Sequence, residues 1–285
     1  MQVYRGMDVG TAKPTAGEQR RVRHHLIDLV EPTEAHDLPR FLGAADEVLD
    51  DIEARGASAL LVGGTGLYVR GIVDALEPPP HFPEIVERLE AEPDTSVLTR
   101  RLAELDPEGL QRIPPGNRRR LVRALEVAIG TGRPFSQWGP GLDRYEATPF
   151  VLTGIRPDRD VLTARIAARY DAQMAGGMMG EAATLAGLGD ALSHTAGQAL
   201  GYRELIAHVR GECTLGDALD TARMRTRRFA VRQLRWFNRD PRITWFDPPG
   251  STGSDPVIVA GRIDDLWRKR AAAGTGSVAT VDQNP

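Results

Sequence analysis

Residues near the start of the chain have the composition of a ligand-binding loop. The segment from Tyr4 to Pro14 reads YRGMDVGTAKP and combines two glycines, a carboxylate, a hydroxyl and one of the chain's two lysines. Glycine and the closing proline favour a loop over a helix or strand, and loops held on a rigid scaffold often carry binding groups. An ordinary polar loop has the same composition, so the interpretation depends on the rest of the chain.

A glycine-rich turn is the second candidate site. The apolar run at residues 58–62 is closed by GGTG at residues 63–66, and helix-compatible residues follow. This order is typical of a buried parallel strand that runs into a helix, and ligands bind at the carboxyl edge of such sheets. The backbone amides and the Thr65 hydroxyl would suit phosphate oxygens, although a plain connecting turn fits equally well. The turn is not a Walker loop, because the sequence Gly-Lys-Ser/Thr occurs nowhere in the chain.

Two arginine-rich segments indicate an anionic partner. Residues 118–123 hold four arginines, which repel one another unless an anion balances them. A solvated face paired in part with Glu126 is the alternative. Residues 223–242 hold eight arginines, and four of these share one face of a helix: Arg228, Arg232, Arg235 and Arg239. The apolar residues between them fall on the other side, so we expect one side to pack and the other to meet anions.

Composition bounds the class of protein. The chain has 285 residues, 41% of them hydrophobic, which is ordinary for a globular protein. A single cysteine fits a reducing compartment, and the sequence has neither a long apolar run nor a signal peptide, so we expect a cytoplasmic protein that does not enter membranes. The net charge of -3 means that polyanion binding must depend on local patches. The histidines and aspartates of residues 24–37 match no zinc spacing, so we expect no structural metal.

The pattern of elements predicts an α/β protein. We expect a helix at 41–55 and strands at 58–62, 148–155 and 242–246. Helical blocks are expected at 83–128, 156–188 and 214–238, the last one beginning with a capping signal at Thr214 and Asp217. The predicted organisation is an α/β core at 1–80 and 145–248, a helical insertion domain at 81–144, and a linker, a final segment and a disordered tail over 249–285, with the tail at 271–285.

Six segments in this order resemble one enzyme family. They are YRGMDVGTAKP, HHLID, LLVGGTGLYVRG, RRLVRALEV, QALGYRE and TRRFAVRQLRWF. Together they resemble the tRNA dimethylallyltransferases, the tRNA isopentenyltransferase family, from residue 1 to about residue 247. The resemblance implies a P-loop-NTPase-like parallel-sheet core with an inserted helical domain. It also implies transfer of a dimethylallyl group from dimethylallyl diphosphate to N6 of the adenosine next to the tRNA anticodon, with Mg²⁺ as cofactor.

The resemblance also implies roles for individual residues. Thr65 would hydrogen-bond at the reaction centre, and Arg169 would hold the diphosphate as negative charge grows on it. The partners implied are the tRNA anticodon stem-loop and dimethylallyl diphosphate, and we expect a monomer. The residues matching segments that contact tRNA in the family are Gln2, which lies in the adenosine-contacting segment, Arg119, Arg120, Arg123, Gln198, Thr226, Arg227, Arg228, Arg232 and Gln233.

The chain departs from the family pattern at its start. Family members carry a glycine-rich phosphate loop with Lys-Ser/Thr, and an Asp-Ser pair, before the segment that matches Met1, and that aspartate is the family's general base. Neither is present here. We therefore expect the first strand and helix of the core to be missing, the start to be an internal methionine, and the printed chain to be nearly inactive.

Alternative functions remain at this point. One is a non-catalytic tRNA-binding remnant that keeps the arginine stripes. Another is prenylation of a free adenine nucleotide, which the anticodon-contacting segments disfavour. Asn117 and Gln173, which stand where many relatives have Asp and Met, are interpreted as tolerable variation.

Overall fold

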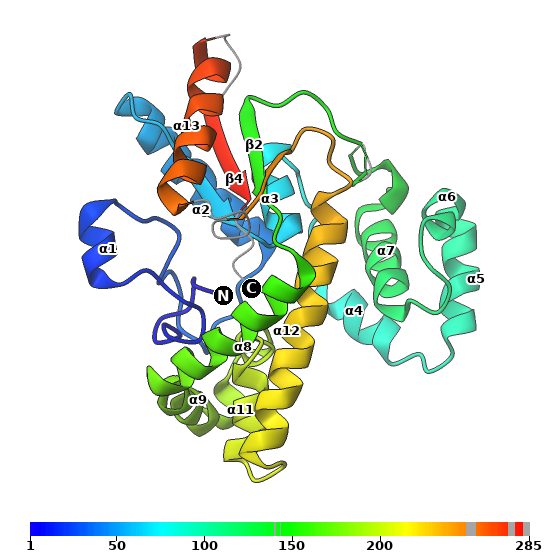
Figure 1. The fold of residues 1–285 in the computed structure, drawn as a ribbon. Coiled ribbons are helices and arrows are strands. Elements are labelled where there is room, and N and C mark those ends of the chain that lie inside the picture. The colour runs from blue at the N-terminus through cyan, green and yellow to red at the C-terminus, as the bar shows by residue number, and fades with distance from the viewer. Residues whose placement is uncertain (140, 143, 249–254, 273–276, 282–285) are drawn as a thin grey trace. The chain divides into compact units, whose positions relative to one another are not determined.

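The chain forms two compact units in a computed structural model that describes residues 1–139, 141, 142, 144–248, 255–272 and 277–281. Unit 1 comprises Met1–Asp74 and Ala147–Pro285, and unit 2 comprises Ala75–Glu146. Helices make up most of both units, and the sheet belongs to unit 1 (Figure 1). The predicted mixed α/β class is therefore confirmed.

The sheet of unit 1 is wholly parallel. Its strands are β1 (Leu60–Gly63), β2 (Phe150–Ile155), β3 (Thr244–Phe246) and β4 (Ser277–Val281), in the order β1-β4-β2-β3. Leu61 and Leu152 both pair with Ala279, and Gly154 pairs with Trp245. The three strands expected from the sequence are confirmed. Since parallel neighbours cannot be joined by a tight turn, each connection passes through helices.

The expectation of a disordered tail is wrong for part of residues 271–285. Residues 277–281 form β4, which lies between β1 and β2 and pairs with both. The sequence SVATV is rich in β-branched residues, which favour strands, and the edges of β1 and β2 offer unpaired backbone groups that a further strand can satisfy. The expected linker at 249–254 and the remainder of the tail, apart from the end of α13, lie outside the described residues.

The helices of unit 1 enclose its main core. Buried side chains of α8, α9, α11 and α12 form this core together with Val3, Tyr4 and Met7 from the N-terminal loop. Thr214 caps α12 as expected, because its side chain accepts a hydrogen bond from the Asp217 amide. Every helix in the described part of the chain is too short or too polar to cross a lipid bilayer. The helices are α1 (Ala16–Arg21), α2 (Leu38–Ala54), α3 (Gly66–Val73), α8 (Arg159–Ala175), α9 (Met178–Gly187), α10 (His194–Gly197), α11 (Tyr202–Val209), α12 (Leu215–Phe237) and α13 (Pro256–Ala272), with a 3-10 turn at Gly189–Ala191.

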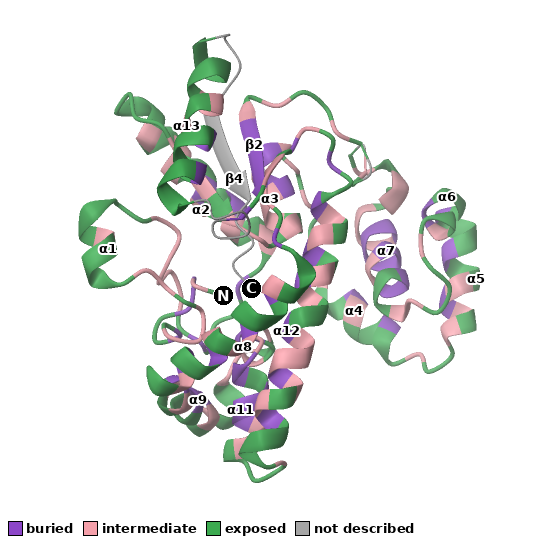
Figure 2. Cartoon of the chain, viewed as in Figure 1, coloured by how far each residue is buried: buried purple, intermediate pink, exposed green. Residues whose placement is uncertain are grey.

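Unit 2 is helical and has its own core. Its helices are α4 (Pro83–Glu90), α5 (Thr95–Leu105), α6 (Pro107–Gln111) and α7 (Arg118–Thr131), followed by a 3-10 turn at Phe135–Gln137. Seven of the 14 residues of α7 are buried (Figure 2). The helix begins at the cap Asn117 and ends at Gly132, whose φ of 70° suits glycine. Four of the buried α7 side chains belong to the hydrophobic core of unit 2.

Candidate functional site

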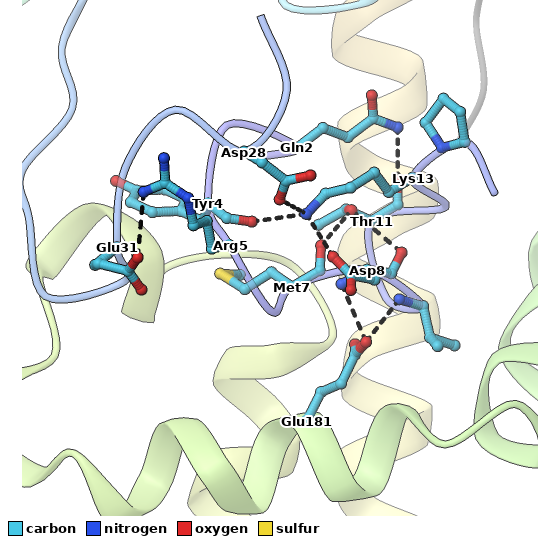
Figure 3. A network of polar contacts seen from close by, with 12 residues as sticks. Gln2, Tyr4, Arg5, Met7, Asp8, Thr11, Lys13, Asp28, Glu31 and Glu181 are labelled. Atoms are coloured by element: carbon cyan, nitrogen blue, oxygen red, sulfur yellow. Dashed lines mark hydrogen bonds and ion pairs between the residues drawn. The ribbon is translucent and has the colours of Figure 1, made fainter. Parts of the chain in front are cut away.

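Lys13 organises the N-terminal loop from its interior (Figure 3). Its side chain is 4% exposed. The Nζ atom donates to the Tyr4 carbonyl at 2.8 Å and to Asp28 Oδ1 at 2.6 Å, and it also donates to Asp8. Because a buried ammonium requires partners, these contacts tie three separate parts of residues 1–28 together. The lysine noted in the sequence is therefore a structural centre of the loop.

Gln2 braces the turn that ends at Lys13. Its Nε2 atom donates to the carbonyls of Thr11 and Ala12, both at 3.1 Å, and the Thr11 hydroxyl donates to the Met7 carbonyl at 2.6 Å. Ala12 adopts a φ of 51°, a left-handed conformation that costs a non-glycine residue about 1 kcal/mol. Surrounding contacts must hold such a turn in place, and Gln2 supplies two of them.

Three side chains of the helical core hold the first half of this turn. Glu181 accepts hydrogen bonds from the amides of residues 8–10, and Tyr202 Oη lies 3.0 Å from the Gly10 amide. Gln173 Nε2 donates to the carbonyls of Val9 and Gly10 at 3.0 and 3.1 Å. The polar backbone of the turn is therefore satisfied by α8, α9 and α11.

The GGTG turn joins β1 to α3 as expected. Thr65 is the N-cap residue of α3, but its side chain makes no capping hydrogen bond and is exposed, so its hydroxyl is available to a ligand. Gln233 of α12 donates to the Gly64 carbonyl at 2.8 Å. A Cβ atom on Gly66 would lie 2.3 Å from the Trp236 ring, so only glycine allows α12 to approach this closely.

Arg169 on α8 is a partly buried cation. Its Nε atom is buried and has no hydrogen-bond partner, and no carboxylate in the described part of the chain pairs with its guanidinium. Burial lowers the pKa of Arg169, because it penalises the charged form. A partly desolvated guanidinium with an unused donor is suited to binding an anion such as a diphosphate.

The arginine stripe of α12 lies on the solvent side of the helix. Arg228, Arg232 and Arg235 are exposed, whereas Ala230 and Phe237 are buried at 2% and 3% exposure, as the helical spacing predicted; Arg239, the fourth member of the predicted stripe, is also exposed but lies in the turn after the end of α12. Arg227 is exposed as well, and the Arg232 guanidinium lies 5.7 Å from the centre of the Phe229 ring. The helix therefore presents positive charge to solvent along its whole second half.

Two other α12 residues of the predicted tRNA-contacting run point inward. The Thr226 hydroxyl is 2.9 Å from Tyr170 Oη, and Thr226 is 2% exposed. Burial raises the pKa of Tyr170, which keeps its hydroxyl protonated. Gln233 is 7% exposed, and its side-chain amide donates a hydrogen bond to the Gly64 carbonyl. In this conformation both side chains fix α12 against the core, and their contact with RNA stays a prediction.

Gln198 is among the residues that line a pocket of about 630 Å³ within residues 189–225. It is exposed, and its Oε1 atom accepts a hydrogen bond from Arg203 at 2.8 Å. Arg225 in the same pocket is paired with the buried Glu204. The pocket wall carries both signs of charge, so it has no marked preference for an anion.

The arginines of α7 in unit 2 divide into two kinds. Arg119 and Arg120 are exposed. Arg123 instead donates to Glu126 at 2.7 Å and to the carbonyls of Pro79 and Pro80 at 2.6 and 3.1 Å. The partial pairing with Glu126 that the sequence allowed as an alternative is thus present, and it involves Arg123.

Glu126 is an ionised carboxylate in the core of unit 2. It is 1% exposed, and it accepts hydrogen bonds from the Phe82 amide at 2.7 Å, from Arg123 and from His81. Burial acts to raise the pKa of Glu126, but the hydrogen bonds from Arg123 and Phe82 outweigh burial, and the pKa is lowered. The Arg123–Glu126 pair therefore helps to hold α7 against residues 79–82.

The described residues offer no ready-made cage for a metal ion, since no three of their His, Cys, Asp or Glu side chains converge. Mg²⁺ is usually bound through one or two carboxylates and substrate phosphates. In the N-terminal loop, Asp8 and Asp28 could supply such carboxylates, but both already accept from Lys13, whose charge leaves the cluster a net charge of only -1. The side chains described here therefore do not form a fitting Mg²⁺ site by themselves.

Sequence reasoning missed the residues that support the site. Glu181 and Tyr202 contact residues 8–10, yet each lies more than half the chain away from them. Tyr202 belongs to the QALGYRE segment, whereas Glu181 stands in no recognisable motif. No local signal could have revealed Glu181, because its role arises only when α9 is placed against the loop.

The chain is similar to known proteins over most of its length. The sequence profile of the IPP transferase family matches residues 2–240. The tRNA dimethylallyltransferases of Kineococcus radiotolerans and Thermobifida fusca are each 44% identical, covering 96% and 94% of this chain and 86% and 85% of theirs. The solved tRNA isopentenylpyrophosphate transferase of Bacillus halodurans is 34% identical, with a TM-score of 0.65 over 96% of this chain and 88% of that one. A eukaryotic dimethylallyltransferase solved acting on tRNA shares the fold at 21% identity, with a TM-score of 0.78 over 97% of this chain and 72% of that one.

Proposed function

The chain belongs to the IPP transferase family, and we propose that its activity is transfer of a dimethylallyl group from dimethylallyl diphosphate to N6 of the adenosine next to a tRNA anticodon. In this reaction a carbon–nitrogen bond forms at N6 while the carbon–oxygen bond to the diphosphate breaks, and N6 loses one proton, which a general base or water must accept. The leaving diphosphate takes the bonding electrons, so its negative charge must be stabilised.

Arg169 is the observation that carries this proposal. The buried Nε–H of Arg169 has no hydrogen-bond acceptor in the empty protein, which is unfavourable, and an oxygen of an incoming diphosphate would supply one. Thr65 lies at the carboxyl edge of the sheet, and its hydroxyl makes no capping hydrogen bond to α3. This hydroxyl would orient the reacting groups. Gln2 would contact the adenosine from the N-terminal loop.

Binding of the tRNA backbone is proposed for arginines of both units. The exposed stripe of α12 in unit 1, together with Arg227, offers donors to phosphates, and Arg119 and Arg120 do so in unit 2. Phosphate contacts fix the register of an RNA, while an unpaired loop base is recognised by stacking and by hydrogen bonds to its edges. Extrusion of the adenosine from the loop would expose N6.

The printed chain is proposed to be a weak catalyst. It contains no Gly-Lys-Ser/Thr phosphate loop and no counterpart of the aspartate that the resemblance implies as general base. We propose that Mg²⁺ enters with the diphosphate, whose oxygens it would bind. We further propose that the protein acts as a monomer in the cytoplasm, where its RNA substrate would be found.

Calorimetric titration with inorganic diphosphate tests the proposal without requiring turnover. Arg169→Gln should weaken binding by about 10- to 100-fold, since it removes charge-assisted hydrogen bonds. Arg159→Gln, an exposed position on the same helix, is the matched control and should bind as the unaltered protein does. Equal affinity of all three proteins would remove Arg169 from the diphosphate site.

Transfer itself is measured with labelled dimethylallyl diphosphate and an anticodon stem-loop RNA. Slow incorporation that depends on Arg169 would support the proposed activity. Tight RNA binding with no incorporation would favour the alternative, a non-catalytic tRNA-binding protein.

A further inference from the structure

Three consecutive backbone amides of the N-terminal loop donate to one carboxylate, that of Glu181, which Figure 3 shows beside the loop. The N–H groups of Asp8 and Val9 donate to Glu181 Oε1 at 3.0 and 2.8 Å, and that of Gly10 donates to Oε2 at 3.2 Å. Successive amides that point into one concavity form a nest that binds an anion. Here the anion is a side chain of α9, close to the N-terminus of that helix, where a negative charge is favoured.

Tyr202 completes this attachment. Its Oη atom donates to Glu181 and accepts from the Gly10 amide at 3.0 Å. A Cβ atom on Gly10 would lie 2.5 Å from the Tyr202 ring, so only glycine fits there. Burial and the hydrogen bond to Glu181 both raise the pKa of Tyr202, and the hydroxyl therefore remains a donor.

The residues that Glu181 holds are connected to Gln2 by further hydrogen bonds. The amides of Ala12 and Lys13 donate to the carbonyls of Val9 and Asp8 at 3.1 and 2.9 Å, so the turn is built on the backbone that Glu181 holds. Gln2 in turn donates to the carbonyls of Thr11 and Ala12. Each step is a direct hydrogen bond, and together they connect α9 to the side chain at the start of the loop.

We propose that Glu181 is a positioning residue for the acceptor adenosine. The inference rests on the proposed function, in which Gln2 contacts that adenosine. Glu181 touches no substrate: it sets the conformation of residues 8–13, and this turn sets the place of Gln2. The arginines of α12 are held by their own helix, so binding of the RNA backbone does not require Glu181.

Glu181→Gln is a selective perturbation. The substitution keeps the size of the side chain but replaces one acceptor oxygen by an NH₂ donor, which must face amide or hydroxyl donors in the nest. Leaving such groups unsatisfied should increase the open population of the loop about tenfold. Tyr202→Phe keeps the packed ring and removes only the hydroxyl. Glu47→Gln, at an exposed position on α2, is the matched control.

Hydrogen exchange measures the loop without RNA. For Glu181→Gln and Tyr202→Phe, we expect the amides of residues 8–10 to exchange about tenfold faster, with no change in peptides from unit 2. Thermal unfolding establishes that each variant is folded. If Glu181→Gln does not unfold cooperatively, Tyr202→Phe decides the question.

A stem-loop RNA with 2-aminopurine directly beside the acceptor adenosine measures placement of that adenosine, because the fluorescence of the probe rises when its neighbour leaves the stack. We expect both variants to bind within about twofold of the normal affinity, since phosphate contacts supply most of it, but to lose more than half of the fluorescence rise at saturation. A fault in overall structure would lower affinity and leave the saturating signal unchanged.

Two results would overturn the proposal for Glu181: unchanged exchange of residues 8–10, or faster exchange with the full fluorescence rise. If the unaltered protein binds the RNA without any rise in fluorescence, the proposed adenosine recognition fails, and so does the positioning role. In that case faster exchange would show only that Glu181 holds the loop.

Discussion

Replacement of Arg123 by glutamine should destabilise unit 2 rather than act only on RNA binding. Arg123 donates to Glu126, Pro79 and Pro80, and its partner Glu126 is 1% exposed. The substitution therefore removes charge-assisted hydrogen bonds and leaves a buried carboxylate with fewer partners. Arg119, which is exposed on the same helix, provides the matched control.

The expected loss follows from these contacts. Hydrogen bonds to a charged group contribute about 1.5–3 kcal/mol each. The Arg123 side chain is 33% exposed, so water screens part of this. Taking the lower end, and allowing glutamine to recover one contact, gives a loss of about 2–3 kcal/mol for unit 2. Arg119→Gln should change stability by less than about 0.5 kcal/mol.

Urea unfolding, with hydrogen exchange in residues 75–146 as the local readout, measures this loss. The pH dependence gives a second check, because the lowered pKa of Glu126 stabilises the folded state above the unfolded pKa of about 4.3. That stabilisation is lost as the pH falls through the folded pKa. Arg123→Gln should show a weaker dependence on acid. Unchanged stability together with loss of RNA affinity would refute the structural role of Arg123.

Two further predictions concern unit 1. Ending the chain after Ala272 removes β4 from between β1 and β2 and should lower the stability of unit 1 by about 2–4 kcal/mol, measured by urea unfolding. A control that ends after Val281 should not, and equal midpoints for both would contradict the role of β4. Replacing Arg228 and Arg232 together by glutamine should weaken stem-loop binding at least about tenfold and reduce its salt slope by about 1.5. Arg101→Gln, at an exposed position on α5 of unit 2, is the control. An unchanged salt slope would exclude phosphate contacts by Arg228 and Arg232.

Much of the fold could be predicted because its signals are local. The apolar run before GGTG indicated β1, and the spacing of arginines and apolar residues indicated the two sides of α12. These patterns depend on the geometry of a single element, which repeats every few residues. The prediction of a disordered tail failed for β4 because this strand forms only by pairing with β1 and β2. These two strands lie far apart in the sequence, so no local pattern indicates that a third strand pairs with both.

The candidate site likewise has features that the sequence predicts and features that only the fold determines. The sequence alone determined the family, through six ordered motifs, and with it the residue types that we propose for binding a diphosphate and RNA. Only the tertiary structure decided which of those residues are free to act. In the folded chain the Nε atom of Arg169 has no hydrogen-bond partner, and Arg228 and Arg232 are exposed to solvent. Arg123, in contrast, is paired with Glu126.

The physical reason is that burial and partnership are properties of the packed chain. A guanidinium has the same chemistry in every arginine, but its free energy depends on whether water, a carboxylate or neither surrounds it. Likewise, the N-terminal loop carries its composition in the sequence, whereas its conformation is set by Glu181 and Tyr202, which only the fold brings to residues 8–10.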